Sequence, residues 1–196
     1  MKIQRNVAGM ATAFEAGLGV LGILLCWWFE IPLRERLAVS WNAAGRSVVA
    51  VIPMAVLLVV AMRSSWRPLA ELRRQVAAMV GVCFSGAAVW ELALLSLAAG
   101  LGEELLFRGA LQPLAARWWG PAIGLVVASL LFGAVHAASV TYFVLATGVG
   151  AYLGWLAQAS EELVTPIVVH AVYDFAALVW LLRVVRDDAG RDEAVD

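Results

Sequence analysis

Charged residues are scarce in this chain, and the long segments without any are its most informative feature. Only 15% of the 196 residues are charged and 63% are apolar, with a mean hydropathy of +0.85. Residues 118–160 contain no Asp, Glu, Lys or Arg. Because a helix crosses a hydrocarbon core with about 20 apolar residues, this segment alone has room for two spans. The composition excludes a soluble domain and predicts an integral protein of the lipid bilayer.

The chain also has few cysteines and almost no net charge. The chain has two cysteines, Cys26 and Cys83, which lie in apolar segments without a CxxC spacing. We expect two small buried side chains rather than a disulfide framework or redox site. The net charge of -1 offers no basic surface to a polyanion, so no nucleic-acid partner is expected. The sequence leaves the oligomeric state open.

Breaks in the apolar pattern predict an all-α fold, a polytopic bundle of about seven transmembrane helices. They occur at Pro32, in the arginine-rich segment 63–75, and at Gly120 and Pro121, since proline and glycine end helices. Segment 63–75 mixes arginines with Trp and Leu and predicts an interfacial loop or short amphipathic helix. The expected spans cover about residues 9–30, 46–62, 76–99, 101–117, 121–138, 140–158 and 163–183.

The domain organisation follows from the absence of repeats and long linkers. We expect one membrane domain over residues 1–186, with a motif-bearing core at residues 100–180, and a solvated tail at 187–196. The N-terminal segment carries Glu15 and runs into Trp27 without a small-residue cleavage site, so it is interpreted as a retained first span. The expected location is the cell (inner or plasma) membrane, as a multi-pass protein.

Orientation is not determined at this stage. With seven spans, the basic residues outside the spans divide seven against six between the two sides, and the positive-inside rule needs a clearer bias. Three acids in or near the spans, Glu15, Glu30 and Glu91, have no assigned role.

The motif GEELLFRG places two carboxylates and an arginine among leucines. Glu104 and Arg108 are four residues apart and share a helix face in the favourable order for an ion pair, so both are expected to support the site structurally. Glu103 is rotated by about 100° from Glu104. An unpaired carboxylate at membrane depth is costly and predicts function.

Both histidines of the chain lie in apolar helices. Phe132 and His136 are one turn apart, and His170 and Asp174 are spaced to face the same way. The carboxylate can order the imidazole, or both can bind a common ligand. Two mechanisms fit these residues: a carboxylate base acting on water with imidazole help, or a metal that activates the water.

These motifs together resemble those of a known family. EExxxR at Glu103 to Arg108, FxxxH at Phe132 to His136 and HxxxD at His170 to Asp174 are similar to the three motifs of the CPBP intramembrane proteases, also called the Abi or CAAX protease family. The resemblance implies hydrolysis of a peptide bond in a membrane-associated protein or peptide.

The resemblance also implies individual roles. Glu103 activates water with His136, while His170 and Asp174 stabilise the oxyanion. Eukaryotic CAAX endopeptidases carry Asn at the position of Asp174. An ionised Asp cannot donate a hydrogen bond to an oxyanion, so prenyl-protein substrates are the weaker part of what the resemblance implies. Prenylated peptides, bacteriocin leaders and C-terminal sorting tags all remain compatible.

No cofactor or metal is expected. A zinc-bound His is oriented by an acceptor. Asp174 can orient only His170, and no second polar partner is found on the helix of His136, whose neighbours are Ala, Val, Gly and Phe. The alternative is zinc held by Glu103, His136 and His170.

Two alternative functions stay open. Buried Glu, His and Asp residues also form the proton relays of membrane transporters. A non-catalytic member of the family that binds peptides or confers bacteriocin immunity is the other alternative.

Overall fold

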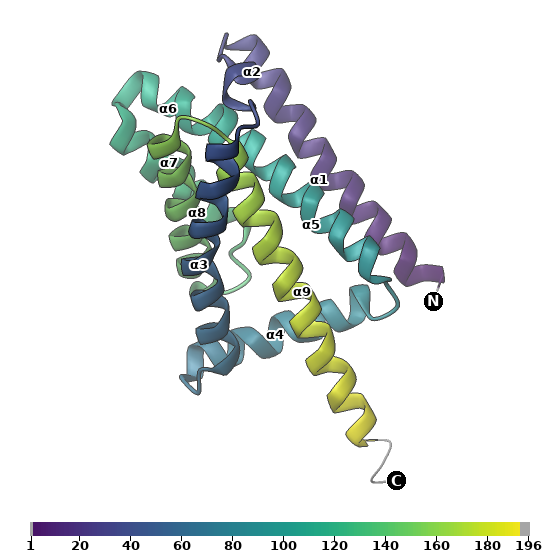
Figure 1. The fold of residues 1–196 in the computed structure, drawn as a ribbon. Coiled ribbons are helices and arrows are strands. Elements are labelled where there is room, and N and C mark those ends of the chain that lie inside the picture. Colours follow the sequence, from purple (N-terminus) through teal and green to yellow (C-terminus); the bar gives the residue numbers. More distant parts are fainter. Residues whose placement is uncertain (1, 193–196) are drawn as a thin grey trace.

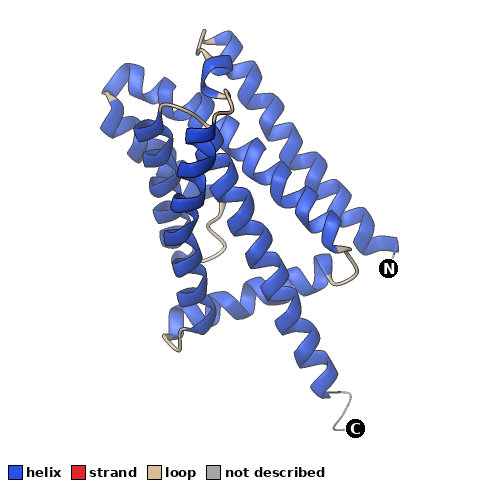
Figure 2. Cartoon of the chain, in the orientation of Figure 1, coloured by secondary structure: helices blue, strands red, loops and turns tan. Residues whose placement is uncertain are grey.

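The computed structural model describes residues 2–192, which form helices joined by short turns, without a strand among them (Figures 1 and 2). The all-helical class predicted from the sequence is confirmed. The elements are α1 (Lys2–Trp28), α2 (Leu33–Arg36), α3 (Trp41–Arg63), α4 (Arg67–Phe84), α5 (Val89–Glu104), a π-helical segment η1 (Leu105–Leu111), α6 (Gln112–Trp119), α7 (Pro121–Val135), α8 (Val140–Ser160) and α9 (Val164–Asp192).

The long helices run between two ends of the molecule, and α4 crosses one of these ends (Figure 1). We call this the α4 end; it contains the N-terminus of α1, the C-terminus of α3 and the N-terminus of α5. The opposite end, called the α2 end, contains α2, the C-terminus of α6 and the turn between α8 and α9 (Figure 1). The chain therefore passes back and forth between the two ends, as in a multi-pass membrane protein.

Within residues 2–192, four helices are long and apolar enough to cross a membrane: α1, α3, α8 and α9. The pair formed by α4 and the continuous helix Val89–Trp119 would be a fifth span, and α7 is a shorter apolar helix. This is roughly consistent with the predicted count of about seven. On α3, Val48, Ile52 and Val56 are exposed whereas Met54 and Leu58 are buried, which is the pattern of one face toward lipid and one toward the protein.

The predicted boundary between the third and fourth spans is wrong. The chain bends by 117° between Phe84 and Val89, inside the predicted span 76–99. It then continues as one helix through Gly100 and Gly102, where a break was expected. The bend follows Ser85 and Gly86, and the Glu91 carboxylate accepts a hydrogen bond from the backbone N of Ala88 at 2.7 Å. Glu91 therefore caps the start of α5.

Glycines allow α1 to pack closely against α5 and η1, and they do not interrupt α5. A Cβ atom on Gly102 would lie 2.0 Å from the backbone O of Glu15, and one on Gly22 would lie 2.7 Å from the backbone of Leu105. Only residues without a side chain allow backbones to approach so closely. This contact places Glu15 next to the GEELLFRG motif, at the level of Gly102 along the helix axis.

The other expected spans have observed counterparts whose ends differ by several residues. Of segment 63–75, residues 67–75 form the first half of the longer helix α4, and Arg63 ends α3. Residues 187–192 of the expected tail continue α9. Residues 193–196 of that tail lie outside the described part of the chain.

Candidate functional site

The two adjacent carboxylates lie where α5 passes into the π-helical segment η1. A π-helical turn widens the helix locally and is frequent at functional sites. Glu104 is 0% exposed and Arg108 1% exposed, and the expected ion pair forms between Glu104 Oε1 and Arg108 Nη1 at 2.8 Å. The predicted contact is thus present in the protein interior.

Arg108 connects three helices around this pair. Its Nη2 donates to the backbone O of Gly150 on α8 at 3.0 Å, and its guanidinium lies 4.4 Å from the ring centroid of Phe132 on α7. One turn further along, Gln112 donates to the backbone O of Gly154 at 3.0 Å. Gly150 and Gly154, four residues apart on α8, therefore supply carbonyl acceptors and also allow close packing.

His170 on α9 completes the environment of Glu104. Its Nδ1 lies 2.9 Å from Glu104 Oε1, and because an ionised carboxylate only accepts, Nδ1 is the donor. The other nitrogen, Nε2, lies 3.4 Å from Asp174 Oδ2. The expected proximity of His170 and Asp174 is confirmed, but the acceptor at Nδ1 is Glu104, which the sequence had assigned to Arg108 alone.

His136 follows directly after α7 and is oriented by the backbone. Its Nδ1 lies 2.8 Å from the carbonyl O of Phe132, which can only accept, so Nδ1 carries the proton. The expectation that nothing on its helix orients His136 is wrong, because the last carbonyls of a helix lack an intrahelical partner and are available. The Phe132 ring also stacks on the imidazole, with centroids 4.6 Å apart.

Glu103 lies between the two imidazoles. Its Oε2 is 3.9 Å from His136 Nε2 and 4.0 Å from His170 Nε2, and it has no hydrogen-bond partner among the described residues. All seven residues singled out from the sequence thus converge on one site, with Glu103 at its centre and Nε2 of both histidines directed toward it.

The geometry also bears on the zinc alternative. Zinc ligands at about 2.0–2.2 Å in a tetrahedral arrangement lie roughly 3.3 Å from one another, which is shorter than the two distances from Glu103 Oε2. Within residues 2–192, no group of three or more His, Cys, Asp or Glu side chains is arranged to hold a metal ion.

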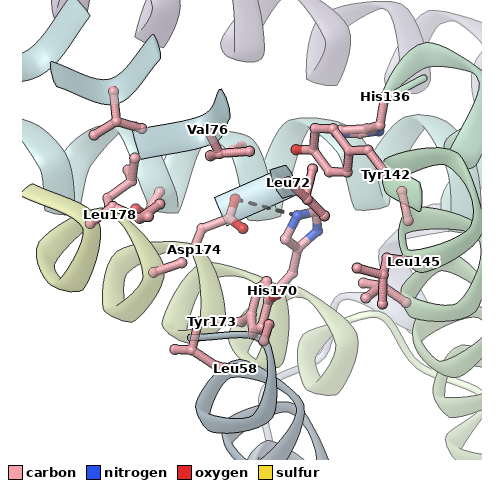
Figure 3. A pocket seen from close by; sticks show the side chains of 18 of the residues that line it. Leu58, Leu72, Val76, His136, Tyr142, Leu145, His170, Tyr173, Asp174 and Leu178 are labelled. Atoms are coloured by element: carbon pink, nitrogen blue, oxygen red, sulfur yellow. Dashed lines mark ion pairs between the residues drawn. The ribbon is translucent and has the colours of Figure 1, made fainter. Parts of the chain in front are cut away.

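A cavity of about 360 Å³ borders the site. Figure 3 shows His170 and Asp174 of α9 facing each other, with His136 and Tyr142 across from them. The remaining lining is mostly apolar and includes Leu72 and Val76 of α4, Leu58 of α3 and Leu178 of α9 (Figure 3). The cavity therefore places an apolar chamber next to the carboxylate and imidazoles.

Glu15 of α1 is a further acid in this cavity, and its Oε2 is buried without a hydrogen-bond partner among the described residues. An acid in the middle of the first span was the one signal in the sequence, and nothing there indicated which groups it would face. Of the other two unassigned acids, Glu91 caps α5, and the backbone O of Glu30 accepts from Arg117 at 3.1 Å.

One comparison with known proteins finds a family match for the segment that carries the three motifs. The family model "Type II CAAX prenyl endopeptidase Rce1-like" matches residues 84–176, which include all three motifs. Searches of curated proteins and of solved structures found no match. This family match, which covers the motif-bearing core, supports the CAAX protease family, also called the CPBP family, as the family that the chain resembles.

Proposed function

We propose that this protein is an endopeptidase of the cell membrane that hydrolyses a peptide bond in a membrane-associated protein or peptide, with Glu103 as the general base. The observation that carries the proposal is the position of Glu103 Oε2, which lies between two histidine Nε2 atoms and has no hydrogen-bond partner among the described residues. A carboxylate that is buried in this way has lost its hydration and is available to accept a proton from a reacting group.

The reaction begins with a water molecule held by Glu103 and His136. Because the Nδ1 proton of His136 is donated to the Phe132 carbonyl, its Nε2 presents a lone pair to the same space and can accept from the water. Glu103 takes one proton from the water, whose oxygen attacks the substrate carbonyl carbon. The proton then passes from Glu103 to the leaving amine as the C–N bond breaks, so that water is consumed and Glu103 is regenerated.

The oxyanion of the tetrahedral intermediate is stabilised by His170. Its Nδ1–H is donated to Glu104, so it donates to the oxyanion only when Nε2 also carries a proton. Glu104 and Asp174 lie beside the two nitrogens and stabilise that positive charge. In this role Asp174 does not itself have to donate, which accounts for an acid where eukaryotic relatives carry an amide.

We further propose that no metal takes part. A glutamate base needs one water and a preorganised donor for the oxyanion, and Glu103, His136 and His170 supply these groups. The distances around Glu103 support this choice over zinc.

The test compares Glu103→Gln with the wild type in cells and after purification. Membrane proteomics identifies a precursor that accumulates in cells carrying the variant, and a peptide spanning its cleavage site serves as the substrate in detergent. Glu103→Gln should fold normally and lose at least about 100-fold in turnover, because general-base catalysis contributes factors of about 10² to 10⁴. Glu35→Gln, an exposed acid on α2, is the matched control and should cleave normally. Comparable cleavage by Glu103→Gln would remove Glu103 from the mechanism.

A further inference from the structure

Glu15 borders the catalytic cavity, and the mechanism proposed above leaves it without a role. It lies at the middle of α1 and lines the cavity, where its Oε2 is buried and has no hydrogen-bond partner among the described residues. It interacts electrostatically with Asp174 and His170 and with Glu103. A carboxylate that leaves water needs a partner in its place, so Glu15 is available for contact with a bound molecule.

The packing of α1 against α5 places Glu15 close to the catalytic base. The two helices run side by side (Figure 1), and a Cβ atom on Gly19 would meet Gly102, whereas one on Gly22 would meet Leu105. Residue numbers therefore rise in the same direction on both helices, and Glu15 is level with the turn of α5 that precedes Gly102. At 1.5 Å per residue, this level is roughly 6 to 8 Å from that of the catalytic base. About two residues of an extended peptide span this distance.

Ser96 adds a second polar group to the same wall of the cavity. It is 1% exposed and lines the cavity, and its Oγ is buried without a hydrogen-bond partner in the described part of the chain. A helical serine can donate to the carbonyl four residues before it, as Ser129 does to Leu125. Ser96 lies two turns before Glu103 on the same face of α5, and its hydroxyl is left for a ligand.

The site has more carboxylates than cationic groups. Glu103 interacts electrostatically with three further acids: Glu15, Glu104 and Asp174. The cations that oppose these four acids are Arg108 and, when it carries two protons, His170, and both already donate to Glu104. Charges at membrane depth are weakly screened, so the excess of negative charge attracts a cation.

The apolar part of the lining indicates what kind of cation fits. Leu58, Leu72, Val76 and Leu178 surround the polar groups (Figure 3). A basic side chain buries its alkyl stem against such a surface while its charged end reaches a polar partner. The cavity therefore suits a cation on an apolar stem better than a hydrated ion.

We propose that Glu15 and Ser96 form a subsite for a basic side chain of the substrate, a Lys or Arg about two residues from the scissile bond. Glu15 pairs with the positive charge, and Ser96 Oγ accepts a second hydrogen bond from the same group. The subsite selects apolar, membrane-associated peptides that carry one basic residue near the cleavage site. The identification of the bound molecule as substrate rests on the proposed function, whereas binding of the cation does not.

A binding experiment tests the subsite without catalysis. The probes are n-octylammonium and the neutral n-octanol, and the protein is the full chain with Glu103→Gln in detergent, so that Glu103 cannot itself pair with the amine. From the rise in unfolding temperature with probe concentration, octylammonium should bind at least about tenfold more tightly than octanol, as expected for a charge-assisted hydrogen bond. Adding Glu15→Gln should abolish this difference, whereas adding Glu35→Gln, at an exposed position, should retain it.

The same experiment assigns Ser96. Adding Ser96→Ala to the Glu103→Gln protein should weaken octylammonium binding by at least about twofold, the lower limit for a neutral hydrogen bond. No change would remove Ser96 from the subsite. Equal affinity of octylammonium for the Glu103→Gln protein with and without Glu15→Gln overturns the proposal.

Cleavage kinetics then test the role in specificity. The substrate is the cleavage-site peptide of the precursor found by membrane proteomics, compared with a peptide in which norleucine replaces its basic residue. In wild type this replacement should raise KM at least about tenfold with little change in kcat. With Glu15→Gln both peptides should show the raised KM.

Two results contradict the subsite. A fall in kcat for both peptides with Glu15→Gln, with the effect of norleucine retained, would show that Glu15 acts through Glu103 instead. Cleavage sites without Lys or Arg within about three residues would also overturn the proposal. If Glu103→Gln still cleaves while the octylammonium result holds, the catalytic assignment fails and the subsite stands.

Discussion

Replacing Glu104 by alanine removes the centre of the buried polar network. Glu104 Oε1 accepts from both Arg108 Nη1 at 2.8 Å and His170 Nδ1 at 2.9 Å. The substitution leaves a guanidinium that is 1% exposed without its counter-ion and an imidazole N–H without its acceptor. Breaking a buried pair from one side costs about 3 to 5 kcal/mol, since an uncompensated charge remains.

Arg108→Ala should cost less, because Glu104 keeps His170 as a donor. The double variant should cost less than the sum of the two single variants by about 0.5 to 3 kcal/mol, the range for residues in one network. For a chain of this size, about 2 to 4 °C corresponds to 1 kcal/mol. Glu104→Ala should therefore lower the melting temperature by roughly 6 to 20 °C.

The assay is thermal unfolding of the purified variants in detergent, followed by intrinsic tryptophan fluorescence. Glu71→Ala is the matched control, because Glu71 and Arg74 form an exposed ion pair on α4, and surface pairs contribute little; its melting temperature should stay near that of wild type. Unchanged melting temperatures for both single variants and the double variant would refute the reasoning. The folded fraction of Glu104→Ala should also cleave more slowly, since His170 has lost the group that orients it.

Two further predictions concern packing and metal dependence. Gly102→Ala should destabilise the protein by about 1 to 3 kcal/mol or more, because the new Cβ would meet the backbone O of Glu15 at 2.0 Å. Gly148→Ala is the control and should not destabilise the protein, because its Cβ would meet nothing within 4 Å. Equal unfolding midpoints for the two variants would contradict the argument. Cleavage should persist after chelation, and elemental analysis of the active enzyme should find no stoichiometric metal. If removal of zinc stops cleavage and its return restores cleavage, zinc rather than Glu103 activates the water.

Composition was sufficient for the class of protein. A chain with so many apolar residues and so few charges has lipid rather than water as its main solvent. In lipid, the hydrogen bonds of the backbone must be satisfied within the protein itself. Uncharged runs as long as residues 118–160 match helical spans of about 20 residues rather than the shorter strands of a barrel, and the all-helical, multi-pass fold followed from both observations. The pairing of Glu104 with Arg108 and the proximity of His170 to Asp174 were likewise predictable, because i, i+4 spacing fixes which side chains share a helix face.

Helix boundaries inside apolar segments were less predictable. The expected boundary between the spans 76–99 and 101–117 lies at Gly100. A glycine in a membrane helix can also permit close packing without a break, and which of the two occurs depends on the partner helix. Here α1 lies against Gly102, while the bend occurs at Ser85 and Gly86. Because α4 lies across one end of the molecule, the C-terminal part of α9 reaches the same end as α4 (Figure 1).

The tertiary structure alone determined how the motifs meet. Nothing in the sequence shows that Glu104 lies within hydrogen-bonding distance of His170, 66 residues away, or that Glu15 lines the same cavity as Glu103. The orientation of His136 depends on a backbone carbonyl that becomes available only because α7 ends at Val135. Local spacing determines which residues share a helix face, but contacts between helices depend on packing, and packing is a property of the whole chain.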